Sequence, residues 1–113
     1  AGATPIVCSP MPRKTWENGK VVRSTRSYSG WAKQVAQQEN VGFVDLNELI
    51  ARRYDAMGEA AVETMFADKN THTTKAGAEL NAEMVASGLR ALPTAPLDSD
   101  LSEKGREVPA AKL

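Results

Sequence analysis

Histidine and cysteine are nearly absent from this sequence of 113 residues, which holds one of each, His72 and Cys8. A single cysteine cannot close an internal disulfide, and these two side chains provide too few ligands for a zinc site. We therefore expect neither a metal nor any other cofactor. Cys8 follows the apolar residues Ile6 and Val7, so we expect a buried structural thiol rather than a reactive one.

An excess of either charge is also absent, because 14 basic residues balance 14 acidic ones. A protein that binds nucleic acid electrostatically would show a basic excess, so nucleic acid is not an expected partner. No apolar run approaches the roughly 18 residues that span a bilayer, and Ala1 does not open a signal-peptide pattern. We expect no membrane partner. The composition, 42% hydrophobic and 25% charged, is typical of a soluble globular chain with at most one domain.

Apolar periodicity predicts strands and helices in alternation. Apolar runs at 3–9 and 41–46 predict buried strands, and helical spacings predict helices at 27–39, 46–57 and about 74–92, with one more turn at 59–65. Such alternation implies a parallel sheet with right-handed crossovers. Asp45 and Glu48 have the spacing of a capping pair, and Thr73 or Thr74 can cap the last helix. We expect one stripe of the first helix to be core: Tyr28, Trp31, Ala32 and Val35.

The last part of the sequence, 93–113, has a different composition. Proline and charged residues dominate it, and too few apolar residues remain to offset the entropy of ordering it. We therefore divide the chain into a domain at 1–92 and a flexible tail at 93–113, which could dock through Leu97 and Leu101.

Acid-base chemistry near neutral pH has to involve His72, because only imidazole has an unperturbed pKa in that range. Asp68 precedes it by four residues on a short loop that leads into the last helix. One interpretation is an acid-histidine pair, in which the carboxylate fixes the tautomer of a general base. The other is a capping or surface histidine, since one Asp and one His fit many loops.

A wider pattern favours the first interpretation. The run Asp68…Thr71-His72-Thr73, followed by Ala76-Gly77-Ala78-Glu79, resembles the last block of the SGNH (GDSL-type) hydrolases, and within them the rhamnogalacturonan acetylesterases. The likeness covers about 1–92 and includes, in the same order, Gly2-Ala3-Thr4, Pro5-Ile6-Val7-Cys8-Ser9, Trp16-Glu17-Asn18-Gly19, Val44-Asp45 and the closing helix. It implies the C-terminal portion of a three-layer α/β/α, flavodoxin-like fold with a parallel sheet.

The sequence departs from that family in two respects. The family places its acid three residues before the histidine, where this chain has Lys69, and Asp68 lies one place earlier. The family's nucleophilic serine lies in an early Gly-Asp-Ser motif, which this chain does not contain. Ser9, Ser24 and Ser29 lie in no Gly-x-Ser-x-Gly or Gly-Asp-Ser context, so we reject them as substitutes.

The resemblance implies a carbohydrate esterase that removes acetyl groups from an acidic, pectin-like polysaccharide such as rhamnogalacturonan, with His72 and Asp68 as catalytic residues. The serine would come from a missing N-terminal half or a second copy of the chain, so this chain alone should be inactive, and should associate or pack loosely. Another SGNH esterase or lipase activity, or a non-catalytic binding role, are the alternatives. The resemblance also implies a secreted or periplasmic protein.

One loop, at about 10–27, is strongly basic. It carries Arg13, Lys14 and three further cations against a single acid, Glu17. A local positive field attracts an acidic substrate, so we interpret Arg13, Lys14 and Trp16 as substrate-binding residues, with Trp16 against a sugar ring. The alternatives are a solvated connection and a tryptophan that anchors the loop to the core.

Overall fold

The computed structural model describes residues 1–112 of the chain. Its elements in order are β1 Ile6–Cys8, β2 Trp16–Glu17, β3 Lys20–Val21, α1 Tyr28–Gln38, β4 Gly42–Val44, α2 Leu46–Met57, α3 Glu59–Glu63, α4 Lys75–Arg90, a 3-10 turn Asp98–Asp100 and α5 Glu103–Glu107. None of the helices in residues 1–112 has the length and apolarity needed to cross a membrane.

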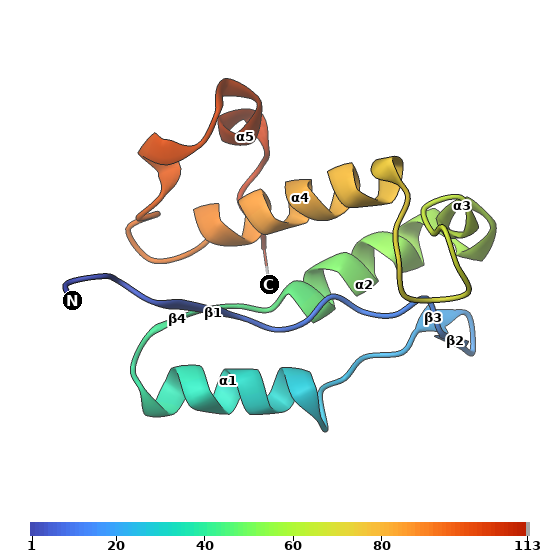
Figure 1. Cartoon of the computed structure of the whole chain (residues 1–113), viewed down its shortest axis with the longest axis horizontal. Helices are drawn as coiled ribbons and strands as arrows, with labels where there is room; N and C mark the ends of the chain where they lie inside the picture. Colours follow the sequence, from blue (N-terminus) through green and yellow to red (C-terminus); the bar gives the residue numbers. More distant parts are fainter. Residues whose placement is uncertain (113) are drawn as a thin grey trace.

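The predicted parallel pairing of two strands is confirmed. β1 and β4 pair in parallel, with Ile6 opposite Gly42 and Cys8 opposite Val44, although each strand is shorter than predicted. Val44 faces α4, where a Cβ on Gly88 would lie 2.3 Å from its Cγ1, whereas Phe43 shares a shallow hollow with Ala36 of α1. The two strands therefore lie between α1 on one face and α4 on the other, an α/β/α arrangement that Figure 1 shows.

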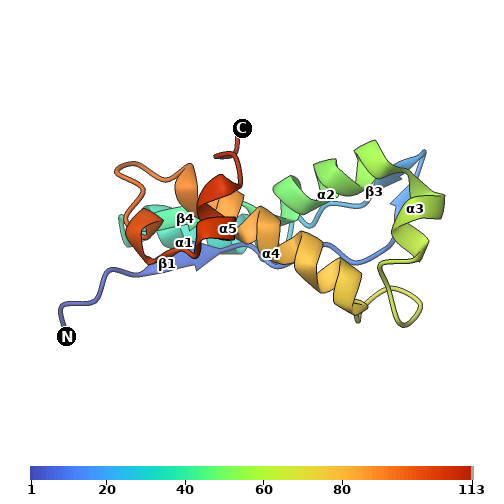
Figure 2. The ribbon, with the colours of Figure 1, turned by 90° about the horizontal axis from the view of Figure 1, so that it is seen from above.

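Helix α2 supplies the centre of the core. Ile50, Ala51 and Tyr54 on α2 are fully buried and pack with Val62 of α3. The phenol of Tyr54 donates to Asn81 Oδ1 on α4 at 2.9 Å, which satisfies both buried groups. Figure 2, the view from above, shows α2 and α4 side by side beyond the strands.

Local capping chemistry sets where two helices begin. Asp45 accepts a hydrogen bond from the Glu48 backbone N–H at 3.2 Å, as its spacing predicted. Thr74, rather than Thr73, caps α4 and accepts from the Gly77 N–H at 3.3 Å. Gly77 is needed there, because a Cβ would lie 2.2 Å from the Met65 carbonyl oxygen.

A hairpin of β2 and β3 was not predicted, although the sequence carries its signal. Trp16 pairs with Val21 and Glu17 with Lys20, in antiparallel register. The two turn residues, Asn18 and Gly19, have φ of 50° and 75°. An Asn-Gly pair is the preferred sequence for a two-residue turn with two positive φ angles.

The core face of α1 was predicted wrongly for its three large residues, whereas the fourth, Ala32, is half-buried. Tyr28, Trp31 and Val35 are 69%, 57% and 48% exposed, whereas Ser29 and Ala36 are buried against the strands. Small residues allow the helix backbone to approach the two-stranded sheet closely, and the large stripe is left on the outer side. The aromatic rings of Tyr28 and Trp31 contact each other edge to face, at 5.3 Å between centroids.

Cys8 also differs from its expected burial. It is exposed at the end of β1. Partial desolvation nevertheless raises the pKa of its thiol, which lowers the thiolate share at neutral pH. The prediction of an unreactive thiol therefore keeps a physical basis, whereas the prediction of a buried one is wrong.

Residues 93–112 lie along α4, as Figure 1 shows. Arg90 forms an ion pair with Asp98 at 2.7 Å and donates to the Val108 carbonyl, and Ser87 donates to the Pro109 carbonyl at 2.8 Å. The segment docks through these polar contacts and through Ala111, which packs against the core. Of the two predicted docking residues, Leu97 is exposed, and Leu101 is half-buried but does not pack against the core cluster. Leu113 lies outside the described residues. The expected flexibility of 93–113, and the domain division at 92, stay predictions.

We predict that Gly88→Ala destabilises the fold, because its methyl group would overlap Val44 Cγ1 and crowd Leu49 Cδ1 at 3.1 Å. Overpacking costs about 1–3 kcal/mol, which outweighs the helix-propensity gain of roughly 0.5–1 kcal/mol from replacing Gly. Urea denaturation followed by tryptophan fluorescence measures the loss. Glu83→Ala, on the exposed side of α4, is the control. Equal stability of Gly88→Ala and the wild type would show that α4 does not approach β4 this closely.

Candidate active site

The loop that carries Asp68 and His72 is closed at its base by backbone pairing. Phe66 and Thr73 form an antiparallel bridge, and the Ala67 N–H donates to the His72 carbonyl at 2.8 Å. Phe66 is buried, and its ring packs edge to face on Tyr54 at 5.9 Å between centroids. The loop is therefore attached to the core of the molecule at its first residue.

The Asp68 carboxylate organises the tip of this loop. Oδ1 accepts from three successive backbone N–H groups, those of Asn70, Thr71 and His72, at 3.1, 2.8 and 3.0 Å. Oδ2 contacts His72 Nδ1 at 2.5 Å. The predicted contact between the Asp68 carboxylate and Nδ1 is confirmed. The extra residue between acid and histidine is accommodated because the loop curls around the carboxylate.

The electrostatics follow from these contacts. The hydrogen bond to His72, reinforced by the N–H groups of Thr71 and His72, holds the pKa of Asp68 far below its usual range. Asp68 is therefore ionised at neutral pH. An ionised acceptor at Nδ1 favours the neutral tautomer that carries its proton there, which leaves the Nε2 lone pair available as a base.

A hollow lies at the carboxyl end of β1, beside this loop. Its lining includes Cys8 of β1, Tyr28 of α1 and Asn47 of α2, together with Thr71 and Thr73 of the loop. His72 is not among the lining residues, and its side chain is 79% exposed. The sequence-based expectation that Nε2 faces a cleft is thus not met in this structure, where only the neighbours of His72 reach the hollow.

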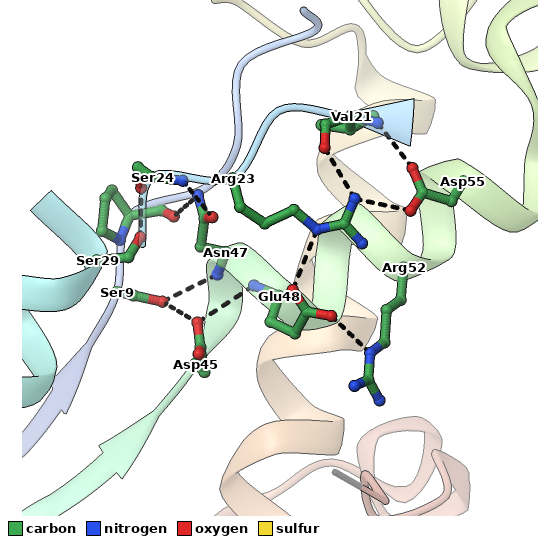
Figure 3. A network of polar contacts seen from close by, with 11 residues as sticks. Ser9, Val21, Arg23, Ser24, Ser29, Asp45, Asn47, Glu48, Arg52 and Asp55 are labelled. Carbon is green, nitrogen blue, oxygen red and sulfur yellow. Dashed lines mark hydrogen bonds and ion pairs between the residues drawn. The ribbon is translucent and has the colours of Figure 1, made fainter. Parts of the chain in front are cut away.

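The rejected serines serve structural roles. Ser9 donates to Asp45 Oδ1 at 2.8 Å and accepts from the Asn47 N–H at 2.9 Å, two contacts that are drawn as dashed lines in Figure 3. The hydroxyls of Ser24 and Ser29 contact each other. Ser9 and Ser29 are buried, and within residues 1–112 none of the three hydroxyls is hydrogen-bonded to His72.

The same network holds the basic loop near both of its ends, at Pro10 and at Ser24. Asn47 Nδ2 donates to the Pro10 carbonyl at 3.1 Å, and Asn47 Oδ1 accepts from the Ser24 N–H at 3.0 Å. Arg23 bridges Glu48 and Asp55, at 3.1 and 2.7 Å, as Figure 3 also shows. These partners were not predicted, because they lie 23 to 37 residues apart in sequence and no local pattern joins them.

The predicted substrate-binding residues have separate placements. Arg13 is exposed and donates to Thr71 Oγ1 at 3.0 Å, so it lies beside the Asp68–His72 loop. Lys14 is buried and paired with Glu63 at 2.8 Å, which argues against contact with a polymer. Trp16 is half-buried against the core, with its indole N–H buried and unpaired among the described residues. This placement favours the interpretation in which Trp16 anchors the loop.

Across residues 1–112, no three His, Cys, Asp or Glu side chains come together as a possible metal site. The Asp68–His72 pair itself brings together a carboxylate and an oriented imidazole that is largely exposed to solvent.

The fold and the sequence have known counterparts. The chain superposes on the SGNH-type fold of the Bacillus subtilis protein YXIM with a TM-score of 0.69 at 24% identity, over 79% of this chain and 26% of that one. No protein-family model matches it.

Two curated relatives are more specific. The chain is 33% identical to the probable rhamnogalacturonan acetylesterase YesY of Bacillus subtilis, over 91% of this chain and 50% of the relative. It is 28% identical to a rhamnogalacturonan acetylesterase of Emericella nidulans, over 73% of this chain and 34% of the relative. The chain thus spans half or less of the length of these relatives, and it resembles part of a rhamnogalacturonan acetylesterase.

We predict that His72→Ala raises the pKa of Asp68, because the contact with His72 is the largest cause of its depression. The value should stay below the usual one of about 3.9, since the backbone N–H groups remain. The pKa of Asp68 is lower in the folded chain than in the unfolded chain, so the ionised carboxylate stabilises the folded turn at pH values above the unfolded-state pKa. That stabilisation is lost as the pH falls through the folded-state pKa. A carboxyl ¹³C titration of Asp68 by NMR measures the shift. An unchanged midpoint in His72→Ala would contradict this account of the pair.

Proposed function

We propose that this chain supplies the acid and the base of an SGNH-type carbohydrate esterase that removes acetyl groups from an acidic, pectin-like polysaccharide. The observation that carries the proposal is the contact between Asp68 Oδ2 and His72 Nδ1 on a loop whose sequence resembles the family's last block. The two acetylesterase relatives support the carbohydrate substrate class.

In this proposal His72 acts on a serine from outside residues 1–112. The serine passes its proton to Nε2 as its oxygen attacks the acetyl carbonyl, and His72 then returns that proton to the departing sugar hydroxyl. Water hydrolyses the acetyl-serine in the same way, with Nε2 again as the base. Asp68 stays ionised and stabilises the imidazolium that forms in each half of the cycle.

We further propose that additional polypeptide of the acetylesterase fold packs on this unit and brings the serine. Within residues 1–112, β1 and β4 form a sheet of two strands, so each strand has an outer edge whose N–H and C=O groups a further strand could pair with. The exposed stripe of Tyr28, Trp31 and Val35 offers apolar surface for such packing. The relatives are two to three times as long as the matched region, which leaves room for further strands and helices.

A different ester substrate is the main alternative, and the ion pair between Lys14 and Glu63 is the observation that favours it. The argument for an acidic polymer depended on the basic loop, and two of its cations, Lys14 and Arg23, are neutralised by internal carboxylates. Arg13 keeps an exposed guanidinium beside the loop, so we retain it as the proposed contact to substrate charge.

A panel comparing acetylated pectin fragments with longer acyl esters separates the two activities. A polymeric substrate too large to cross a membrane would be met outside the cytoplasm.

The catalytic roles can be tested in a chimera in which this chain replaces its counterpart in YesY. We predict that Asp68→Asn lowers kcat for acetyl-ester hydrolysis on the order of 10²- to 10⁴-fold with little change in KM, because the neutral amide no longer selects the tautomer or stabilises the imidazolium. His72→Ala should cost about 10⁴-fold or more. Asp100→Asn, in the 3-10 turn, is the matched control. Activity that survives His72→Ala would refute the proposed base and leave a non-catalytic role.

The packing proposal predicts that the isolated chain self-associates through its uncovered surface at micromolar concentration. Trp31→Lys should shift it toward monomer, because a charge on that stripe opposes apolar contact. Size-exclusion chromatography with light scattering measures the mass. Leu97→Lys, which changes an exposed apolar residue on the 93–112 segment, is the control. A wild-type chain that is monomeric at every concentration would contradict the proposal and favour a complete small binding unit.

A further inference from the structure

The loop that holds Asp68 and His72 is braced by a segment from far away in the sequence. The Lys14 backbone N–H donates to the Asn70 carbonyl at 3.0 Å, and Arg13 reaches Thr71 Oγ1 at 3.0 Å. Thr71 in turn donates to Asn70 Oδ1 at 2.8 Å. Two adjacent residues of the β1–β2 connection therefore run along the outer turn of the loop.

The Lys14 side chain passes inward to the base of the same loop. Its ammonium lies 2.8 Å from Glu63 Oε1, 3.5 Å from the Asp68 carbonyl oxygen and 5.3 Å from the centre of the Phe66 ring. An ammonium group has three N–H donors, and these three partners offer a carboxylate, a carbonyl and an aromatic face. The side chain is 5% exposed, so the charge depends on these partners rather than on water.

These contacts fall on the residues that determine where the catalytic acid lies. Phe66 anchors the loop to Tyr54, and the carbonyl that faces Lys14 belongs to Asp68 itself. If the Asp68 backbone shifted, its carboxylate would lose the geometry in which Oδ1 meets three N–H groups and Oδ2 meets Nδ1. The lysine thus connects the end of α3, through Glu63, to the backbone of the acid.

We propose that Lys14 is a positioning residue that holds the Asp68–His72 contact in place. Its ammonium group does so by contacting the Phe66 ring, the Asp68 carbonyl oxygen and the Glu63 carboxylate. This role replaces the substrate contact expected from its charge. It rests on the proposed function only for the statement that the Asp68–His72 pair is catalytic. The position of the pair is a property of this chain and can be measured without activity.

His72 is the single histidine of the chain, so an imidazole ¹H–¹⁵N spectrum of the ¹⁵N-labelled protein contains signals from one residue. When the spectrum is recorded on the neutral ring, the ¹⁵N shifts report which nitrogen carries the proton. We expect the Nδ1–H tautomer to predominate in the wild type. Lys14→Met keeps the apolar stem and removes the donors, and the Nδ1–H share should fall toward the value given by Asp68→Asn. Lys33→Met, on α1, removes an exposed lysine and should match the wild type.

The outcomes distinguish the two proposals. A Lys14→Met spectrum identical to wild type overturns the positioning role but leaves the Asp68–His72 pair, and with it the proposed function, intact. A wild type without an Nδ1–H preference overturns both. If Lys14→Met loses its overall fold, as judged by backbone amide dispersion, Glu63→Gln decides instead, because Glu63 is 67% exposed and the amide keeps its shape. A smaller loss in the same direction supports the proposal, and no change in Glu63→Gln refutes it.

Discussion

The burial of one face of α2 is the constraint on which the rest of the structure depends. Ile50, Ala51 and Tyr54 have no exposed surface, and the strands, α3 and α4 are arranged around them. Full burial of a large apolar side chain such as that of Ile50 stabilises a fold by about 1.5–3 kcal/mol. Tyr54 extends this core in two directions, because its hydroxyl bonds to Asn81 on α4 and its ring packs on Phe66. The acid-histidine loop is thus fixed to the core at Phe66, while its tip remains in solvent.

The tip itself is organised by a single carboxylate. In an exposed loop an ion pair alone contributes little, because water and salt screen it. Asp68 differs, since one oxygen gathers three backbone N–H groups and only the other is used for His72. The backbone contacts fix the acid relative to the ring, so the two side chains do not have to find each other from freely moving positions. These backbone contacts curl the loop, so that an acid four residues before the histidine reaches its Nδ1.

The features that the sequence predicted are mainly those set by residues close together in the sequence. The parallel strands, the helices, the Asp45 and Thr74 caps and the Asp68–His72 contact all follow from periodicity, capping chemistry or short spacing, and the structure confirms them. The outward face of α1 was missed because its two stripes, large and small, have the same helical period. The pairing of Lys14 with Glu63 was missed because charge alone does not indicate a partner about fifty residues away. The β2–β3 hairpin, in contrast, had a readable Asn-Gly signal.

Folding pairs some of the cations of the basic loop with carboxylates of the same chain, so fewer of them can attract a substrate than the sequence suggests. Lys14 and Arg23 bond to Glu63, Glu48 and Asp55, so their fields are largely cancelled at a distance from the surface. Arg13 remains exposed and donates to Thr71, the residue that precedes His72 in the sequence. Any attraction of an acidic polymer by this loop near the reacting group would then rest mainly on Arg13. In the proposed function, the charge of Arg13 would attract the substrate close to the imidazole, whereas Lys14, beside it in the sequence, would hold the loop in place.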